Sequence, residues 1–166
     1  MTAIRTLRIS LAFIGSFTVF PAATLAETFD AGIILGDPTG LSFKGWLNNV
    51  DAYDIAASWS TDGRDKRYIH ADYLRHDYTL LKVPHGDLPV YYGIGARVLD
   101  RDNRKTRAGI RIPLGLDYQL YRLPLSLFIE VAPRLDLTPD TDFELEGALG
   151  VRYRFFMPET RTRGNR

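Results

Sequence analysis

The sequence predicts an all-β protein: an eight-stranded antiparallel up-and-down transmembrane β-barrel that follows a cleaved signal peptide. Three observations lead to this fold class. The chain opens on an apolar leader, turn residues divide the remainder into eight segments, and the last four segments alternate between apolar and polar residues. Apolar residues make up 45 % of the chain and aromatic residues 12 %, which suits strands better than a disordered or coiled-coil chain.

The leader has the three parts of a secretory signal peptide. Arg5 and Arg8 supply positive charge, residues 9–20 are predominantly apolar, and small residues precede a cleavage position after Ala26. The apolar run is about a dozen residues long and ends at Pro21, whereas a membrane-spanning helix needs about 20 residues. We therefore expect cleavage and export rather than anchoring by a helix.

The remainder of the 166-residue chain is long enough for one domain and too short for two ordinary ones. We expect a signal peptide over residues 1–26, an outer-membrane barrel over residues 27–156 and a disordered basic tail over residues 157–166. There is no cysteine, which excludes disulfides and thiolate sites. The formal charge is +1 and no basic stretch carries interleaved aromatics, so we expect no nucleic-acid partner.

Seven connections rich in Gly, Pro, Asn and Asp separate the expected strands. They are centred on residues 36–40, 48–49, 61–63, 85–87, 100–103, 122–124 and 138–140. The strands between them are expected near residues 28–35, 41–47, 52–60, 67–83, 89–98, 106–120, 125–137 and 142–156. Pro113 and Pro133 each remove a backbone donor in mid-strand, so the strands that hold them need a bulge or another irregularity.

The last four strands separate apolar from charged residues with a period of two, and successive side chains of a strand point to opposite faces. One face carries no charged or amide side chain from Val90 to Phe155. The other face carries five positive and five negative residues, which we expect to form a structural ion-pair network in the lumen: Arg97, Arg111, Asp117, Glu130, Arg134, Asp136, Glu144, Glu146, Arg152 and Arg154.

A soluble barrel could show the same alternation with its charges in water, so three further features decide the orientation of the faces. Strands of about 13 residues at ~3.4 Å each, tilted by ~40°, rise roughly 33 Å and cross an apolar band of ~25 Å. Glycines such as Gly95 and Gly115 on the charged face make room for arginines in a narrow lumen. Aromatic residues such as Tyr92 and Trp59 lie towards strand ends, as in interfacial girdles.

The last hairpin allows a prediction of strand register. A tight turn over residues 138–142 would place Arg134 opposite Glu146 and set Glu130 diagonal to Arg152. Buried charges need such partners.

The final strand resembles the terminal strand of outer-membrane barrels, where a glycine, a hydrophobic residue and a final aromatic residue guide assembly. Gly150, Tyr153 and Phe155 fit this pattern. Ala148 stands where the pattern usually has a polar residue, and ten further residues follow Phe156. The resemblance implies that the barrel-assembly machinery is a partner during biogenesis.

Four further segments, residues 32–42, 70–74, 91–95 and 130–139, are similar to an uncharacterised family of small bacterial outer-membrane barrels. This likeness covers nearly the whole mature chain. It implies a fold similar to the OmpA membrane domain and OmpX, with a filled interior and outer-membrane lipid around it. It brings no agreed biochemical activity.

Ser58, His70 and Asp72 are the one group that suggests an enzyme. A turn around Gly63 would set Ser58 opposite His70, so that a nucleophile, a base and an orienting carboxylate could be arranged. The simpler interpretation is three polar lumen residues that share hydrogen bonds, since no oxyanion donor or lipid-A enzyme motif accompanies them. We therefore expect no catalytic residues.

Two other sites are considered. His70, Asp72 and His76 could bind a metal, but alternate positions on one strand lie nearly 7 Å apart and converge poorly, so we expect no metal and no cofactor. Lys44, Trp46, Arg97 and Arg111 could line a permeation path, although an eight-stranded barrel is normally filled by its own side chains.

Three functions follow from these readings. The first is a monomeric outer-membrane protein of structural or envelope-integrity type, with a filled, charge-compensated lumen and no enzymatic activity. The second is an outer-membrane lipid-modifying enzyme that uses Ser58, His70 and Asp72. The third is a soluble periplasmic barrel that binds a small hydrophobic ligand, with the two faces reversed.

Overall fold

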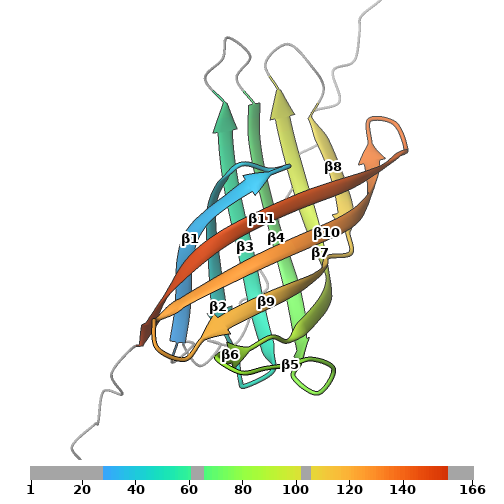
Figure 1. The fold of residues 1–166 in the computed structure, drawn as a ribbon. Coiled ribbons are helices and arrows are strands. Elements are labelled where there is room, and N and C mark those ends of the chain that lie inside the picture. Colours follow the sequence, from blue (N-terminus) through green and yellow to red (C-terminus); the bar gives the residue numbers. More distant parts are fainter. Residues whose placement is uncertain (1–27, 61–65, 102–105, 157–166) are drawn as a thin grey trace, which may run out of the picture.

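The computed structural model describes residues 28–60, 66–101 and 106–156, which form one closed antiparallel barrel (Figure 1). The expected signal peptide and the expected tail lie outside the described residues. The described part of the chain contains no helix that is long and apolar enough to cross a membrane. The strands are β1 (Thr28–Gly36), β2 (Gly40–Trp46), β3 (Asp51–Ser60), β4 (Lys66–Asp77), β5 (Lys82–Val83), β6 (Gly86–Asp87), β7 (Val90–Arg101), β8 (Arg107–Arg111), β9 (Leu114–Leu120), β10 (Leu125–Thr138) and β11 (Asp142–Phe156).

Eight strand positions make up the wall, because β8 and β9 share one position and β5 and β6 belong to a connection. Neighbouring positions are antiparallel and follow the chain order from β1 through β4, β7, β8 with β9, and β10 to β11. The first and last strands then pair from Thr28 opposite Phe156 to Gly36 opposite Ala148, which closes the barrel. The predicted all-β, eight-stranded antiparallel up-and-down barrel is confirmed.

The turn between β1 and β2 shows why β1 ends at Gly36. Gly36 has a φ of 126°, a conformation that favours glycine, and Thr39 Oγ1 accepts a hydrogen bond from the Gly36 amide at 3.0 Å. These contacts close the short connection between β1 and β2. The expected turn at this position is therefore present.

Pro113 interrupts the sixth strand position without changing its register, so the expected irregularity takes the form of a break between β8 and β9. Neither Pro113 nor Pro133 can donate a backbone hydrogen bond. The Gly93 amide still donates to the Pro113 oxygen at 3.0 Å, and the Ile112 amide donates to the Pro133 oxygen at 2.9 Å. β10 itself continues through Pro133.

The fourth strand is shorter than the sequence suggests. We expected it to reach residue 83, but β4 ends at Asp77. The Asp77 Oδ1 atom accepts hydrogen bonds from the Thr79 amide at 2.8 Å and the Thr79 hydroxyl at 2.6 Å, and such a turn ends a strand. The following residues form the β5–β6 hairpin, whose Gly86 pairs with Leu120 at the end of β9.

The two faces of the wall are inverted relative to a water-soluble protein. On the outer face, Ile94 is 59 % exposed and Leu149 is 54 % exposed. On the inner face, Arg111 and Arg152 are each 1 % exposed. Six residues make a small apolar cluster inside the barrel: Ile34, Ala56, Leu74, Tyr91, Phe128 and Ala148.

Outward aromatic side chains gather towards the end of the barrel where β1 begins and β11 ends. Seven lie on that side: Phe29, Tyr53, Tyr73, Tyr92, Tyr118, Tyr153 and Phe155. Trp59 and Phe143 lie towards the opposite end. The aromatic residues therefore mark both ends of the apolar belt, with one end much richer than the other.

Candidate functional site: the charged interior

The inward positions of all eight strands deliver charged side chains to one narrow interior. Of the ten residues predicted to form the lumen network, eight are at most 5 % exposed, while Arg154 is half-buried and Glu144 is exposed. Burial of ions is costly unless they are paired. The structure brings all ten residues into ion pairs, which fall into three groups along the barrel.

The first group lies towards the β10–β11 turn. Arg97 donates to Asp136 from Nε at 3.0 Å and from a terminal nitrogen at 2.6 Å, a two-pronged contact across the lumen. Arg134 forms ion pairs with Glu144 and, at 3.3 Å, with Glu146. These pairs join β7, β10 and β11 across the interior near that end.

The register of β10 and β11 differs from the prediction. Arg134 lies opposite Glu144 rather than Glu146, and Glu130 lies opposite Ala148. Arg152 lies opposite Ser126 and is not diagonal to Glu130. The slip is two residues, which leaves every side chain on its predicted face and changes only its neighbours.

The second group occupies the middle of the barrel around Arg111. This guanidinium donates to Asp72 at 2.7 Å and to Glu130 at 2.5 Å, and its Nε lies 3.5 Å from Glu146. Tyr91 also donates to Glu130, at 2.9 Å. One arginine therefore serves three carboxylates.

The third group lies towards the end that holds the two chain termini of the barrel. Arg152 donates to Asp54 at 2.9 Å and to the Ser42 hydroxyl at 2.8 Å. Its guanidinium carbon lies 3.7 Å from the centre of the Phe128 ring, which places the cation over an aromatic face. Arg154 pairs with Asp30 at 3.0 Å.

Lys44 belongs to the third group and joins β2 to β4 and β9. Its ammonium group donates to Asp117 at 2.8 Å and lies 3.1 Å from His76 Nε2. The other ring nitrogen of His76 lies 3.1 Å from the Val50 carbonyl oxygen, so it carries the ring proton and donates there. His76 thus belongs with Lys44 and does not approach His70 as a shared metal ligand.

Sequence reasoning missed several interior residues of the first three strands. Asp30, Lys44 and Asp54 are all buried and paired, yet only Lys44 was considered, as a lining residue. The signal that could have identified them is the period-two alternation of a strand. Each of the three is separated from another buried residue on its own strand by an even number of positions. Small residues on both faces of these strands, such as Ala31 and Gly32, obscure that signal.

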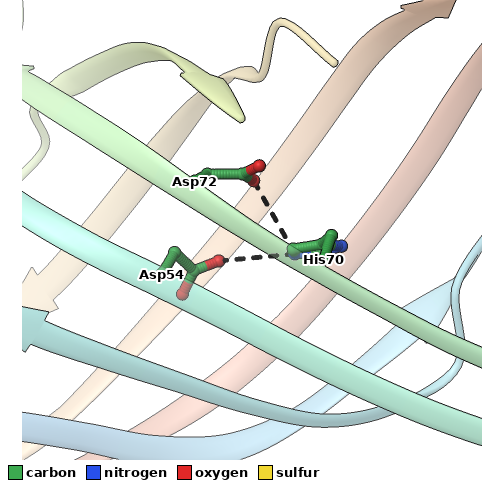
Figure 2. A group of neighbouring side chains, drawn as sticks. All are labelled: Asp54, His70 and Asp72. Carbon is green, nitrogen blue, oxygen red and sulfur yellow. Dashed lines mark ion pairs between the residues drawn. The ribbon is translucent and has the colours of Figure 1, made fainter. Parts of the chain in front are cut away.

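The candidate catalytic group is not assembled as predicted. Ser58 lies opposite Tyr68, and His70 lies opposite Ala56. Among the described residues, His70 contacts Tyr68, Asp54 and Asp72. Figure 2 shows the carboxylates of Asp54 and Asp72 facing the same edge of the His70 ring. The group around His70 therefore has a histidine and two carboxylates but no serine nucleophile.

The predicted assembly residues lie at the terminal end of β11. Tyr153 and Phe155 face outward and are 46 % and 40 % exposed. The Phe155 ring stacks on Phe29 at a centroid distance of 4.8 Å. Gly150 faces inward, where any side chain would collide with the Phe128 ring. Interior glycines therefore make room for aromatic rings as well as for charged groups.

The fold is similar to that of a solved bacterial β-barrel domain. The N-terminal β-barrel domain of Pseudomonas aeruginosa OprF is 14 % identical, with a TM-score of 0.56, and the match covers 79 % of this chain and 99 % of that domain. Ail, the attachment invasion locus protein of Yersinia pestis, is 12 % identical, with a TM-score of 0.39, and the match covers 77 % of this chain and 97 % of Ail. No family model matches the chain, and no curated protein does. The similarity to OprF supports the expected fold resemblance to small outer-membrane barrels.

Proposed function

We propose that this protein is an integral β-barrel of the bacterial outer membrane that acts as a structural element of the envelope. The observation that carries the proposal is the exposed apolar belt on all eight strand positions, combined with a charged interior. A closed barrel satisfies its backbone hydrogen bonds internally, which is the requirement for crossing lipid with strands.

The belt fits lipid much better than water. Its mid-strand residues Ile94, Ile129 and Leu149 are each more than half exposed. Soluble monomers rarely expose contiguous apolar patches beyond a few hundred Å². Aromatic side chains at both ends of the belt favour the same placement, because Tyr and Trp prefer the membrane interface.

The interior supports a filled lumen with no through channel. Three buried ion pairs block it at different heights: Arg97 with Asp136, Arg111 with Asp72, and Arg152 with Asp54. At the terminal end a cavity of about 220 Å³ reaches as far as Arg154 and Gln119. An eight-stranded barrel is just wide enough for its own side chains, so these pairs support a lumen without a continuous passage.

We further propose that the chain is a monomer, that outer-membrane lipid is its main partner, and that the barrel-assembly machinery recognises Gly150, Tyr153 and Phe155. The position of Tyr153 and Phe155 on the outer face of the closing strand supports this assignment. A leader cleaved after Ala26 would bring the chain to the periplasm.

The other two functions receive less support. A lipid-modifying hydrolase needs Ser58 beside His70, and the register of β3 and β4 separates them. A soluble barrel with an apolar ligand cavity needs the reverse orientation of its faces, because the apolar residues here are exposed and the charged residues are buried.

Two measurements test the proposal. Expressing cells would be fractionated, and the envelope protein would be run on a gel with and without boiling. We expect an outer-membrane band that shifts on heating; a soluble, unshifted band would refute the membrane placement.

The filled lumen is tested separately by conductance. Protein reconstituted in a planar bilayer should show no steady ion current, since the three buried pairs obstruct the interior. A stable current from the wild-type protein would contradict the filled lumen while leaving the membrane placement intact.

A further inference from the structure

In the group around His70, the imidazole nitrogen and the two carboxylates face one another at distances too long for hydrogen bonds. His70 Nε2 lies 3.7 Å from Asp72 Oδ2 and 3.9 Å from Asp54 Oδ2, along the dashed lines in Figure 2. Asp54 and His70 are 1 % exposed and Asp72 is 2 % exposed. Among the described side chains, neither His70 Nε2 nor Asp72 Oδ1 has a hydrogen-bond partner.

The neighbouring hydrogen bonds determine which nitrogen of His70 carries a proton. The Tyr68 hydroxyl donates its hydrogen to Glu146 at 3.0 Å, so its oxygen is an acceptor towards His70 Nδ1, 3.2 Å away. Nδ1 must therefore carry the hydrogen. In the neutral ring, Nε2 then presents a lone pair towards two carboxylates, and three electron-rich atoms meet in one place.

We propose that Asp54, His70 and Asp72 bind a divalent transition-metal cation such as Zn²⁺ inside the barrel. One ligand atom from each residue lies within 4.8 Å of the other two. Metal–ligand distances of about 2.0–2.2 Å separate neighbouring ligand atoms by roughly 3–3.6 Å. The two distances from His70 Nε2, 3.7 Å and 3.9 Å, lie just above this range, and the two carboxylates would draw together around the ion. A proton on Nε2 would fit less well, because a hydrogen bond needs about 2.7–3.2 Å between the heavy atoms.

The charges around the group also favour a cation. Arg152 neutralises Asp54 at 2.9 Å, but Arg111 divides its contacts among Asp72, Glu130 and Glu146. Glu146 also pairs with Arg97 and Arg134, whereas among the described residues Arg111 is the one arginine that contacts Asp72 and Glu130. Two carboxylates therefore share one arginine. A divalent ion would supply the missing positive charge in a region where unpaired charge is costly.

The ligand types indicate the class of metal. Imidazole suits Zn²⁺, Ni²⁺ and Cu²⁺, while carboxylates alone suit Mg²⁺ and Ca²⁺. The carboxylates are also held by Arg111 and Arg152, which fixes their orientation as outer partners of metal ligands commonly do. A site with one imidazole and two oriented carboxylates is suited to Zn²⁺.

The full-length protein would be folded in detergent and freed of metal with a chelator. Zn²⁺ would then be titrated into it, and calorimetry would measure the binding. Zn²⁺ would also be supplied during folding, because the lumen is closely packed. We expect one saturable equivalent per barrel. His70→Ala and Asp72→Asn should each weaken binding at least roughly tenfold, a loss of the size seen when a partner of a metal site is removed.

His85→Ala is the matched control, because His85 is exposed in the β5–β6 hairpin and its removal should leave Zn²⁺ binding unchanged. The heat-shifted gel band would verify that each variant is folded. A Co²⁺ absorption spectrum that depends on His70 would support the same site. Absence of saturable Zn²⁺ binding, or wild-type affinity in folded His70→Ala protein, would overturn the proposal.

Discussion

Replacement of Arg111 by methionine tests whether the interior ion pairs stabilise the barrel. The substitution keeps most of the side-chain volume but leaves Asp72, Glu130 and Glu146 without their shared cation. Breaking one buried ion pair costs about 3–5 kcal/mol. Because Arg111 donates to two carboxylates at 2.7 Å or less, we expect a loss near the upper end, about 5 kcal/mol. Urea unfolding in lipid vesicles, followed by tryptophan fluorescence, would measure it.

Arg75→Met is the matched control. Its side chain is 58 % exposed and lies 3.6 Å from Asp51, so its removal should cost no more than about 1 kcal/mol. If Arg111→Met prevents folding, adding Asp72→Asn and Glu130→Gln should restore a folded barrel by removing the unpaired charges. An equal cost for the two methionine variants would show that water screens the interior charges, and the reasoning would fail.

Two further predictions concern the wall. Leu149→Arg places a charge in the middle of the exposed belt and should lower the free energy of unfolding in lipid vesicles by about 2–4 kcal/mol. Phe143→Arg, near the strand end, should lower it by at most about 1 kcal/mol. Equal losses for the two variants would show that the belt does not lie in lipid. Gly115→Ala would press a methyl group against the Tyr91 ring and the Ile129 carbonyl oxygen and should cost about 1–3 kcal/mol by the same unfolding assay. Gly147→Ala is the control, because nothing lies within 4 Å of the new methyl group, and it should change stability by less than about 0.5 kcal/mol. A larger loss for Gly147→Ala would contradict crowding as the reason for the loss in Gly115→Ala.

The sequence predicted the later strands closely because their alternation is strong. The last strand was expected at residues 142–156 and β11 spans Asp142–Phe156, while β10 differs by one residue from its expected range. The fourth strand was overextended because residues 78–83 are rich in β-forming side chains. A single aspartate turn at Asp77 outweighs that composition.

Strand register could not be predicted in the same way. Two predicted pairs were wrong. Arg134 lies opposite Glu144 instead of Glu146, and Ser58 lies opposite Tyr68 instead of His70. Each is a shift of two residues. A period-two pattern is unchanged by such a slip, so it determines the face of each residue but not its partner. The length of the turn determines the partner, and that is the quantity least visible in the sequence. The meeting of Asp54 with His70 depends on this register and was therefore missed.

The contacts of β11 have a consequence for how the chain matures. Arg152 reaches Ser42 and Asp54, and Arg154 reaches Asp30, so the last strand supplies the positive partners of the first three. A growing chain that lacks β11 holds these aspartates uncompensated and must keep them hydrated. Barrel closure by β11 and neutralisation of these interior aspartates therefore occur together. A chain that lacks β11 cannot exclude water from its interior.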